Sequence, residues 1–201
     1  MMKQLQAAKR LLASAALLCT AAAAQAGPII NGGFEATPDP TQGWTLSGNH
    51  SYSYFDGFAP HSGLVGASFG ASPADPALIS QTLSTVAGAT YRLSFWLQNE
   101  ADASQDMPNF FSMNWDGGAT ELLLTNAGAF GYQEFVYEFV ASSAATELSF
   151  GFGNFASYWD FDDVSVGAVP EPGSLALALA GIAGCAAARR RRAVVTCPAA
   201  A

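Results

Sequence analysis

The strongest constraint on how this chain can fold is an alternation of apolar and polar side chains with a period of two residues. The clearest example runs from Thr90 to Gln98, where every odd position is apolar and most even positions are polar. Successive side chains of a β-strand point to opposite faces of a sheet, so this pattern is typical of a strand with one face in a core. Three further segments alternate in the same way: Phe110–Trp115, Tyr132–Val140 and Thr146–Phe152.

Six shorter segments also have the composition of strands, and turn residues such as those of Asp116–Gly118 separate the segments. The six are Trp44–Ser47, Ser51–Phe55, Leu64–Phe69, Leu78–Leu83, Glu121–Thr125 and Tyr158–Val166. Between Gly27 and Val169 no segment has the 3.6-residue period of an amphipathic helix. About ten short strands without helices predict an all-β fold, an antiparallel β-sandwich.

The N-terminal segment has the features of a signal peptide. Basic residues within Met1–Arg10 precede the apolar stretch Leu11–Ala24, and Ala24-Gln25-Ala26 has the small-x-small pattern that signal peptidase needs. We therefore expect residues 1–26 to form a signal helix that is removed by signal peptidase during export through the inner membrane. The mature domain is then predicted to span residues 27–169.

The C-terminal segment combines three features in a fixed order. Pro170, Glu171 and Pro172 come first, and the two prolines prevent the preceding strand from continuing. The apolar run Leu175–Ala188 follows and is shorter than the roughly 20 residues with which a helix crosses a bilayer. Four consecutive arginines close the segment: Arg189, Arg190, Arg191 and Arg192. Because such clusters stay on the cytoplasmic side, we expect the mature domain to lie outside, next to a short transmembrane helix.

This order of features at residues 170–192 resembles the PEP-CTERM sorting signal of exported proteins in Gram-negative bacteria that make extracellular polysaccharide. The resemblance implies recognition by an exosortase, a membrane-embedded cysteine protease-transpeptidase, with cleavage near Pro170–Pro172. It also implies transient membrane anchoring and delivery to the cell surface or the extracellular matrix. The tail at residues 193–201 departs from the family, whose members usually end soon after the arginines. The alternative is a plain single-pass anchor of a surface protein.

The charge of the mature domain excludes one class of partner. Of the eight basic residues, Arg92 alone lies between residues 27 and 169, against fifteen acidic residues (all sixteen except Glu171), which gives a net charge of −14. Nucleic acid binding needs basic patches, so nucleic acid is excluded as a partner. An acidic domain also repels anionic polymers, and we therefore expect any polysaccharide partner to be neutral. The domain has no cysteine, so its own core or a metal must stabilise it.

Both ends of the domain carry a second resemblance. Asn31–Glu35, Trp159–Val166 and the segment Leu78–Trp96 look like parts of the galactose-binding-like jelly rolls that many carbohydrate-binding modules use. The resemblance implies a jelly-roll sandwich whose first and last strands lie close together. It also implies that a structural calcium ion could be bound between those two strands.

The residues themselves support a calcium site through the last strand. Asp162 shares a face with Val164 and Val166, the apolar positions that we expect to point inward. A carboxylate on the core side is costly unless it is paired or bound to a metal. Calcium prefers oxygen ligands, which Glu35, Asp162 and Asp163 would supply together with backbone carbonyls. The alternative is that these acids are solvated or hydrogen-bonded at a sheet edge.

Trp96 is the best candidate for a sugar-binding residue. It lies on the polar face of its predicted strand with Arg92, Ser94 and Gln98, and an exposed indole can stack on a sugar ring. Asn114, with Ser112, lies on the polar face of another strand and would join this site if the two strands are neighbours. Trp44, Tyr158 and Trp159 are second-rank candidates near strand ends. The alternative is that most of these aromatic side chains belong to the core.

No catalytic motif stands out in the sequence. The domain has two histidines, no cysteine, and no nucleophile-elbow or glycine-rich phosphate motif, so we expect it to be non-catalytic. Two classes of function remain. One is a glycan-binding module retained in an extracellular polysaccharide, and the other is a structural or adhesive matrix protein that makes protein contacts without a sugar site.

Overall fold

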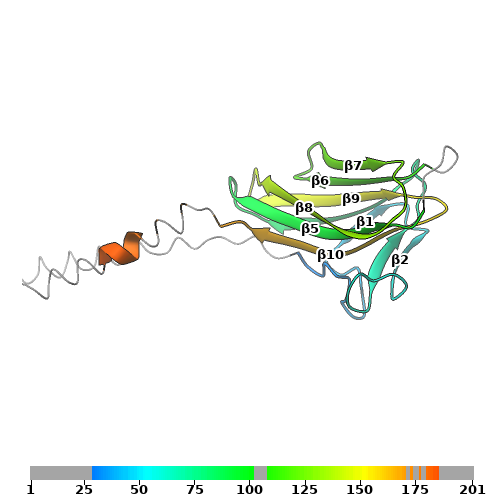
Figure 1. Ribbon diagram of the computed structural model, residues 1–201, viewed down its shortest axis with the longest axis horizontal. Helices are drawn as coiled ribbons and strands as arrows, with labels where there is room; N and C mark the ends of the chain where they lie inside the picture. The colour runs from blue at the N-terminus through cyan, green and yellow to red at the C-terminus, as the bar shows by residue number, and fades with distance from the viewer. Residues whose placement is uncertain (1–28, 102–107, 171–172, 174–176, 178–179, 186–201) are drawn as a thin grey trace, which may run out of the picture.

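A computed structural model describes residues 29–101 and 108–170, together with residues 173, 177 and 180–185. These residues contain ten β-strands in two antiparallel five-stranded sheets, which pack face to face (Figure 1). The predicted all-β sandwich is therefore confirmed, and each of the ten predicted strands has a counterpart within a few residues of its expected ends.

The two sheets divide the chain between them. The first has the strand order β1-β4-β9-β6-β7, with β1 Thr45–Gly48, β4 Ala77–Ser84, β9 Ala145–Gly153, β6 Phe110–Trp115 and β7 Thr120–Thr125. The second has the order β2-β3-β10-β5-β8, with β2 Ser53–Asp56, β3 Gly66–Phe69, β10 Trp159–Ala168, β5 Thr90–Asn99 and β8 Phe130–Val140. The last strand, β10, is thus the central strand of the second sheet.

The core consists largely of aromatic rings from the inner faces of both sheets. Phe95 of β5 is fully buried and lies 5.6 Å from Phe111, 5.3 Å from Phe150 and 5.5 Å from Phe161, measured between ring centroids. Each such ring contributes on the order of 1.5–3 kcal/mol through burial alone. The outer faces of the strands consequently lie toward solvent.

The prediction that Asp162 shares an inward face with Val164 and Val166 is wrong. Asp162 pairs across the strands with Trp96, on the outer face, while its neighbour Phe161 points into the core. The register of β10 against β5 shifts between Asp162 and Ser165, and Asp163 has a φ of +51°. This bulge inserts a residue and reverses the alternation, so Val164 and Val166 point inward while Asp162 does not.

The opening segment, residues 31–35, is a turn rather than a strand, but it does contact β10. The Val164 N–H donates to the Gly32 carbonyl at 3.0 Å, and a Cβ atom at Gly32 would come within 2.0 Å of the Val164 oxygen. Phe34 is fully buried and stacks on Trp44 with ring centroids 5.7 Å apart. The two ends of the domain therefore lie side by side, as the sequence resemblance implied.

The chain leaves the sandwich directly from the end of β10. The Val169 N–H still donates to the Thr90 carbonyl at 2.8 Å, and residues 180–185 are helical. Within the described part of the chain, no helix has the length and apolarity needed to cross a bilayer. Several predicted processing residues lie outside the described residues: Ala24, Ala26, Glu171, Pro172 and Arg189–Arg192.

Candidate functional site

The outer face of the second sheet carries a hollow of about 260 Å³. Its lining residues come from strands β2 and β3, from the turn after β2, and from the residue before β10: Tyr54, Asp56, Phe58, Ser68 and Tyr158. The alternation of β2 explains why they meet, because Phe55 packs against the core while Tyr54 and Asp56 point outward. Ser68 lies directly opposite Tyr54 on the neighbouring strand and forms part of the same wall.

Aromatic rings dominate the rim of this hollow. Tyr54 and Tyr158 meet edge to face, with ring centroids 5.9 Å apart, and Phe58 is 81% exposed. A Cβ atom at Gly70 would come within 2.7 Å of the Tyr158 ring, so only a glycine lets that ring lie against the sheet. Exposed rings of this kind can stack on the apolar face of a sugar.

A buried carboxylate lies behind the polar wall of the hollow. Asp160 is fully buried on β10, where it accepts hydrogen bonds from the Ser68 hydroxyl at 2.6 Å and from Gln98 Nε2 at 3.0 Å. Burial raises the pKa of Asp160 to about 6, a rise that the Ser68 hydrogen bond opposes and the nearby Glu100 carboxylate reinforces. Asp160 therefore fixes the Ser68 and Gln98 side chains beside the hollow.

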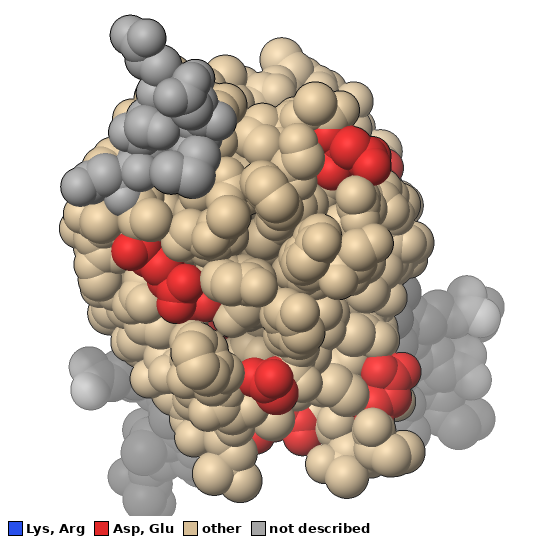
Figure 2. Space-filling view, turned by 90° about the vertical axis from the view of Figure 1, so that its right-hand side faces the viewer, with Lys and Arg blue, Asp and Glu red and all other residues tan. Residues whose placement is uncertain are grey.

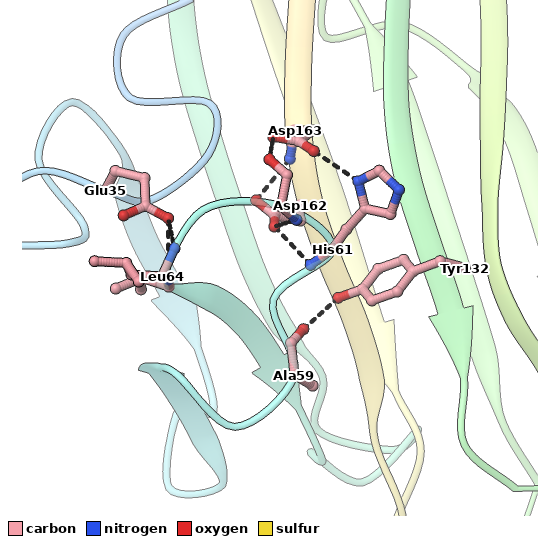
Figure 3. A network of polar contacts seen from close by, with 9 residues as sticks. Glu35, Ala59, His61, Leu64, Tyr132, Asp162 and Asp163 are labelled. Atoms are coloured by element: carbon pink, nitrogen blue, oxygen red, sulfur yellow. Dashed lines mark hydrogen bonds and ion pairs between the residues drawn. The ribbon is translucent and has the colours of Figure 1, made fainter.

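A loop at residues 57–65, which we call the strap, crosses the same face of the sheet toward β8. The Tyr132 hydroxyl donates to the Ala59 carbonyl at 2.5 Å, and the backbone N–H groups of His61 and Ser62 donate to Asp162 Oδ2 at 2.9 and 3.2 Å (Figure 3). Burial raises the pKa of Asp162 to about 6, and its backbone hydrogen bonds oppose that rise. The strap thus covers Asp162 and removes it from solvent.

Two more carboxylates hold the strap. Glu35 Oε1 accepts from the N–H groups of Leu64 at 2.6 Å and Val65 at 2.8 Å, and Asp163 Oδ2 lies 2.7 Å from His61 Nδ1. Figure 3 shows Glu35 reaching the strap from one side, with Asp162 and Asp163 of β10 on the other. The predicted calcium ligands therefore do lie close together, but each already accepts hydrogen bonds from the strap.

Carboxylate oxygens are ligands that calcium prefers, and the backbone at Gly33 lies close to two of them: a Cβ atom there would be 3.3 Å from Asp163 Oδ1 and 3.7 Å from Asp162 Oδ1. Among the residues that the structure describes, however, no three His, Cys, Asp or Glu side chains are placed to hold a metal ion together. Any calcium ion would therefore need backbone carbonyls as well as these carboxylates.

The predicted sugar-binding residues are separated by the fold. Trp96 lies on the outer face as expected, but His61 of the strap stacks on its indole with ring centroids 3.8 Å apart and planes 14° apart. Gln98 lies beside the hollow through its bond to Asp160. Arg92 lies at the other end of β5, opposite Gly167 and Glu138.

Asn114 and Ser112 do not join these residues. Both lie on β6, whose neighbours are β9 and β7 in the first sheet, so β5 and β6 are not adjacent. Asn114 Oδ1 is buried and has no hydrogen-bond partner in the described structure. Of the second-rank candidates, Trp44 and Trp159 belong to the core, and Tyr158 lines the hollow.

Tyr54, Asp56 and Phe58 are site residues that the sequence pattern did not indicate. Their segment was expected to contain a strand, and its alternation places Tyr52 and Tyr54 on one face. The pattern does not say which face meets the core, because β2 is short and carries aromatic rings on both sides. Only its pairing with β3 decides the matter.

Comparison with known proteins identifies the C-terminal segment. Residues 168–192 match the model of the PEP-CTERM protein-sorting motif, so the predicted sorting signal is confirmed. Such a motif indicates a secreted protein that is anchored in the membrane transiently and processed by an exosortase. No curated protein sequence matches the chain.

Several solved structures resemble the sandwich. TmCBM61 in complex with β-1,4-galactotriose is 17% identical, with a TM-score of 0.52, over 70% of this chain and 97% of that one. The CBM22-1-GH10 modules of Clostridium thermocellum xylanase 10B, complexed with xylohexaose, are 16% identical, with a TM-score of 0.51, over 71% of this chain and 29% of theirs. The enzymatically active domain of bacteriophage CBA120 tailspike protein 4 is 16% identical, with a TM-score of 0.50, over 70% and 21%. The predicted likeness to carbohydrate-binding-module jelly rolls is confirmed at the level of the fold.

Proposed function

We propose that this chain is an exported, non-catalytic protein that binds a polysaccharide through the hollow on the outer face of its second sheet. The observation that carries the proposal is the aromatic rim of Tyr54, Phe58 and Tyr158 beside hydrogen-bonding groups that Asp160 fixes in place. Rings supply stacking area, and the polar groups supply orientation. A hollow of about 260 Å³ is smaller than most drug-sized pockets, so it suits one or two sugar residues of a longer polymer.

The charge of the domain supports a polymer without acidic groups. Fifteen acids against Arg92 between residues 27 and 169 would repel an anionic polysaccharide. A polymer that is neutral along most of its length meets no such repulsion. It is therefore the best match to this surface.

The arrangement of carboxylates favours binding over hydrolysis. Most glycosidases need two carboxyl groups on either side of the scissile bond. Asp160 is fully buried, and Ser68 and Gln98 occupy both its oxygens, so of the residues that line the hollow only Asp56 offers a carboxylate.

The direction of β10 favours presentation of the hollow away from the membrane. Tyr158 lines the hollow immediately before β10 begins, whereas the sorting motif starts at residue 168, where the strand ends (Figure 1). Ten strand residues separate these points by about 30 Å. After signal peptidase has acted and before exosortase cleaves, the C-terminal segment would anchor the chain in the membrane. In that state the hollow would point away from the membrane, toward the surroundings of a Gram-negative cell.

Calcium remains part of the proposal as a structural ion. Glu35, Asp162 and Asp163 crowd around Gly33, and the nearest Arg or Lys in the domain is the distant Arg92. Carboxylates and carbonyls are the ligands that calcium prefers, and a cation would relieve the repulsion between the neighbouring Asp162 and Asp163. Its role would be to hold the strap to β10.

Binding of the full-length chain, purified in detergent, to a panel of neutral and acidic polysaccharides would test the proposal. We expect saturable binding to one neutral class, a loss of at least tenfold in Tyr54→Ala, and no change in Leu123→Ala, which alters an exposed side chain of the other sheet. A parallel series in calcium and in chelator tests the ion. If a folded chain binds no polymer, the structural or adhesive matrix protein is the better account.

A further inference from the structure

Acidic side chains lie at and near the hollow, as they do over the rest of this acidic domain. Asp56 lines the hollow, Asp160 lies behind Ser68, and the Glu100 N–H donates to the carbonyl of Tyr158, a lining residue, at 3.1 Å. One carboxylate, Asp56, therefore lines a hollow that is otherwise mainly aromatic, and two more acids lie just behind or beside it.

No basic side chain balances these acids. Arg92, the one Lys or Arg between residues 29 and 170, lies six residues from Gln98 along β5, which is about 20 Å. It faces Glu138 on the neighbouring strand instead. Figure 2 views the molecule from the end at which β10 begins, and the visible surface there carries acidic side chains and no Lys or Arg.

The aromatic rim and the acids favour the same kind of ligand group. An ammonium group beside a carboxylate forms a charge-assisted hydrogen bond, which is about twice as strong as a neutral one. The faces of Tyr54 and Phe58 attract a cation through their π-electrons. Asp56 is exposed, and one of its oxygens accepts from the Phe58 N–H at 2.9 Å, so its carboxylate is held at the edge of the hollow.

We infer that the polysaccharide bound by this hollow carries free amino groups, as in an amino-sugar polymer from which part of the N-acetyl groups has been removed. The inference rests on the proposed glycan binding and narrows its ligand class. A mostly neutral polymer with scattered ammonium groups places a sugar ring on the aromatic rim and a positive charge against Asp56. Full N-acetylation removes that charge and leaves the ring contacts.

The test compares two hexamers that differ only in this group: β-1,4-linked glucosamine hexaose and its fully N-acetylated counterpart. Their dissociation constants are measured by titration calorimetry on the full-length chain in detergent at pH 6, where the amines are protonated, at low salt and in chelator. We expect the free-amine hexamer to bind at least about tenfold more tightly. Asp56→Asn should remove most of that difference, because it weakens the binding of the free-amine hexamer far more than that of the acetylated hexamer.

Glu121→Gln is the matched control, because it removes the same charge from an exposed position on β7 in the other sheet. Equal affinity for both hexamers would overturn the amino-group inference and leave glycan binding intact. An equal loss of free-amine binding in both variants would assign the effect to general attraction and overturn the role of Asp56. If neither hexamer nor any polymer of the panel binds, the proposed function itself fails.

Discussion

His61 of the strap lies flat against Trp96 of β5, with ring centroids 3.8 Å apart and an angle of 14° between the planes. The same imidazole is paired with Asp163 at 2.7 Å, so it links the strap both to a ring and to a carboxylate. The half-buried indole thus has one face on protein rather than on solvent. Trp96 lies on the outer face as expected, but the strap covers one face of its indole.

Removing the imidazole should open this indole face. We expect His61→Ala to remain folded, because the backbone N–H groups of residues 61 and 62 still reach Asp162, and to lose about 1–2 kcal/mol of stability. Acrylamide quenching of tryptophan fluorescence measures the exposure directly, since Trp44, Trp115 and Trp159 are all buried. Quenching should rise in the variant. Unchanged quenching would contradict the stacked arrangement.

Asp162 and Asp163 are neighbours on β10, but they should differ in their importance for stability. Asp162 is fully buried and accepts from the N–H groups of His61, Ser62 and Asp163, so Asp162→Ala would leave three donors without an acceptor. We expect a loss of about 3 kcal/mol in the free energy of unfolding. Asp163→Ala, at a side chain that is 30% exposed, should cost about 1 kcal/mol. Chemical denaturation of both variants measures the difference, and equal losses would argue against a central role for Asp162.

These contrasts also show how far the sequence could predict the fold and the site. The period-two alternation depends on local geometry alone, and it located four strands, including the buried face of β5, while composition and turn residues located the other six. The position of Asp162 could not be predicted in this way, because a bulge at Asp163 reverses the alternation without a mark in the residue pattern. The hollow and the covered Trp96 depend on how β2 and the strap that follows it lie against β10. These contacts join residues about 100 positions apart in the sequence, such as His61 and Asp162.

The acids on β10 predict an unusual dependence of stability on pH. The pKa of Asp160 is about 6 in the folded protein, against 3.8 for an unperturbed aspartate, so the folded state holds this proton more tightly than the unfolded state. Its contribution to stability is fully present below about pH 3.8 and is lost as the pH rises through 6. Asp162 has the same sign and about the same pKa.

In chelator, to exclude any effect of bound cations, the free energy of unfolding should therefore fall by about 1 kcal/mol per group between pH 5 and pH 7.5. Denaturation at these two pH values checks the fall. Asp160→Asn, which replaces one carboxylate oxygen by an NH2 group of the same size and cannot titrate, should reduce this fall in the free energy of unfolding by about half. A free energy of unfolding that rises over this range would contradict the assignment.

Two glycines should respond differently to the same added methyl group. At Gly32 a Cβ atom would lie 2.0 Å from the Val164 carbonyl oxygen, a backbone atom that can move only if the opening turn separates from β10. That separation breaks the Val164–Gly32 hydrogen bond and loosens Phe34, which the turn holds in the core. Gly32→Ala should therefore cost about 3 kcal/mol or more.

At Gly131 of β8 nothing lies within 4 Å of the added atom, so Gly131→Ala should be neutral or slightly stabilising. Thermal unfolding of the pair measures both effects, and a Gly32→Ala variant as stable as the parent chain would show that the opening turn does not depend on its close contact with β10.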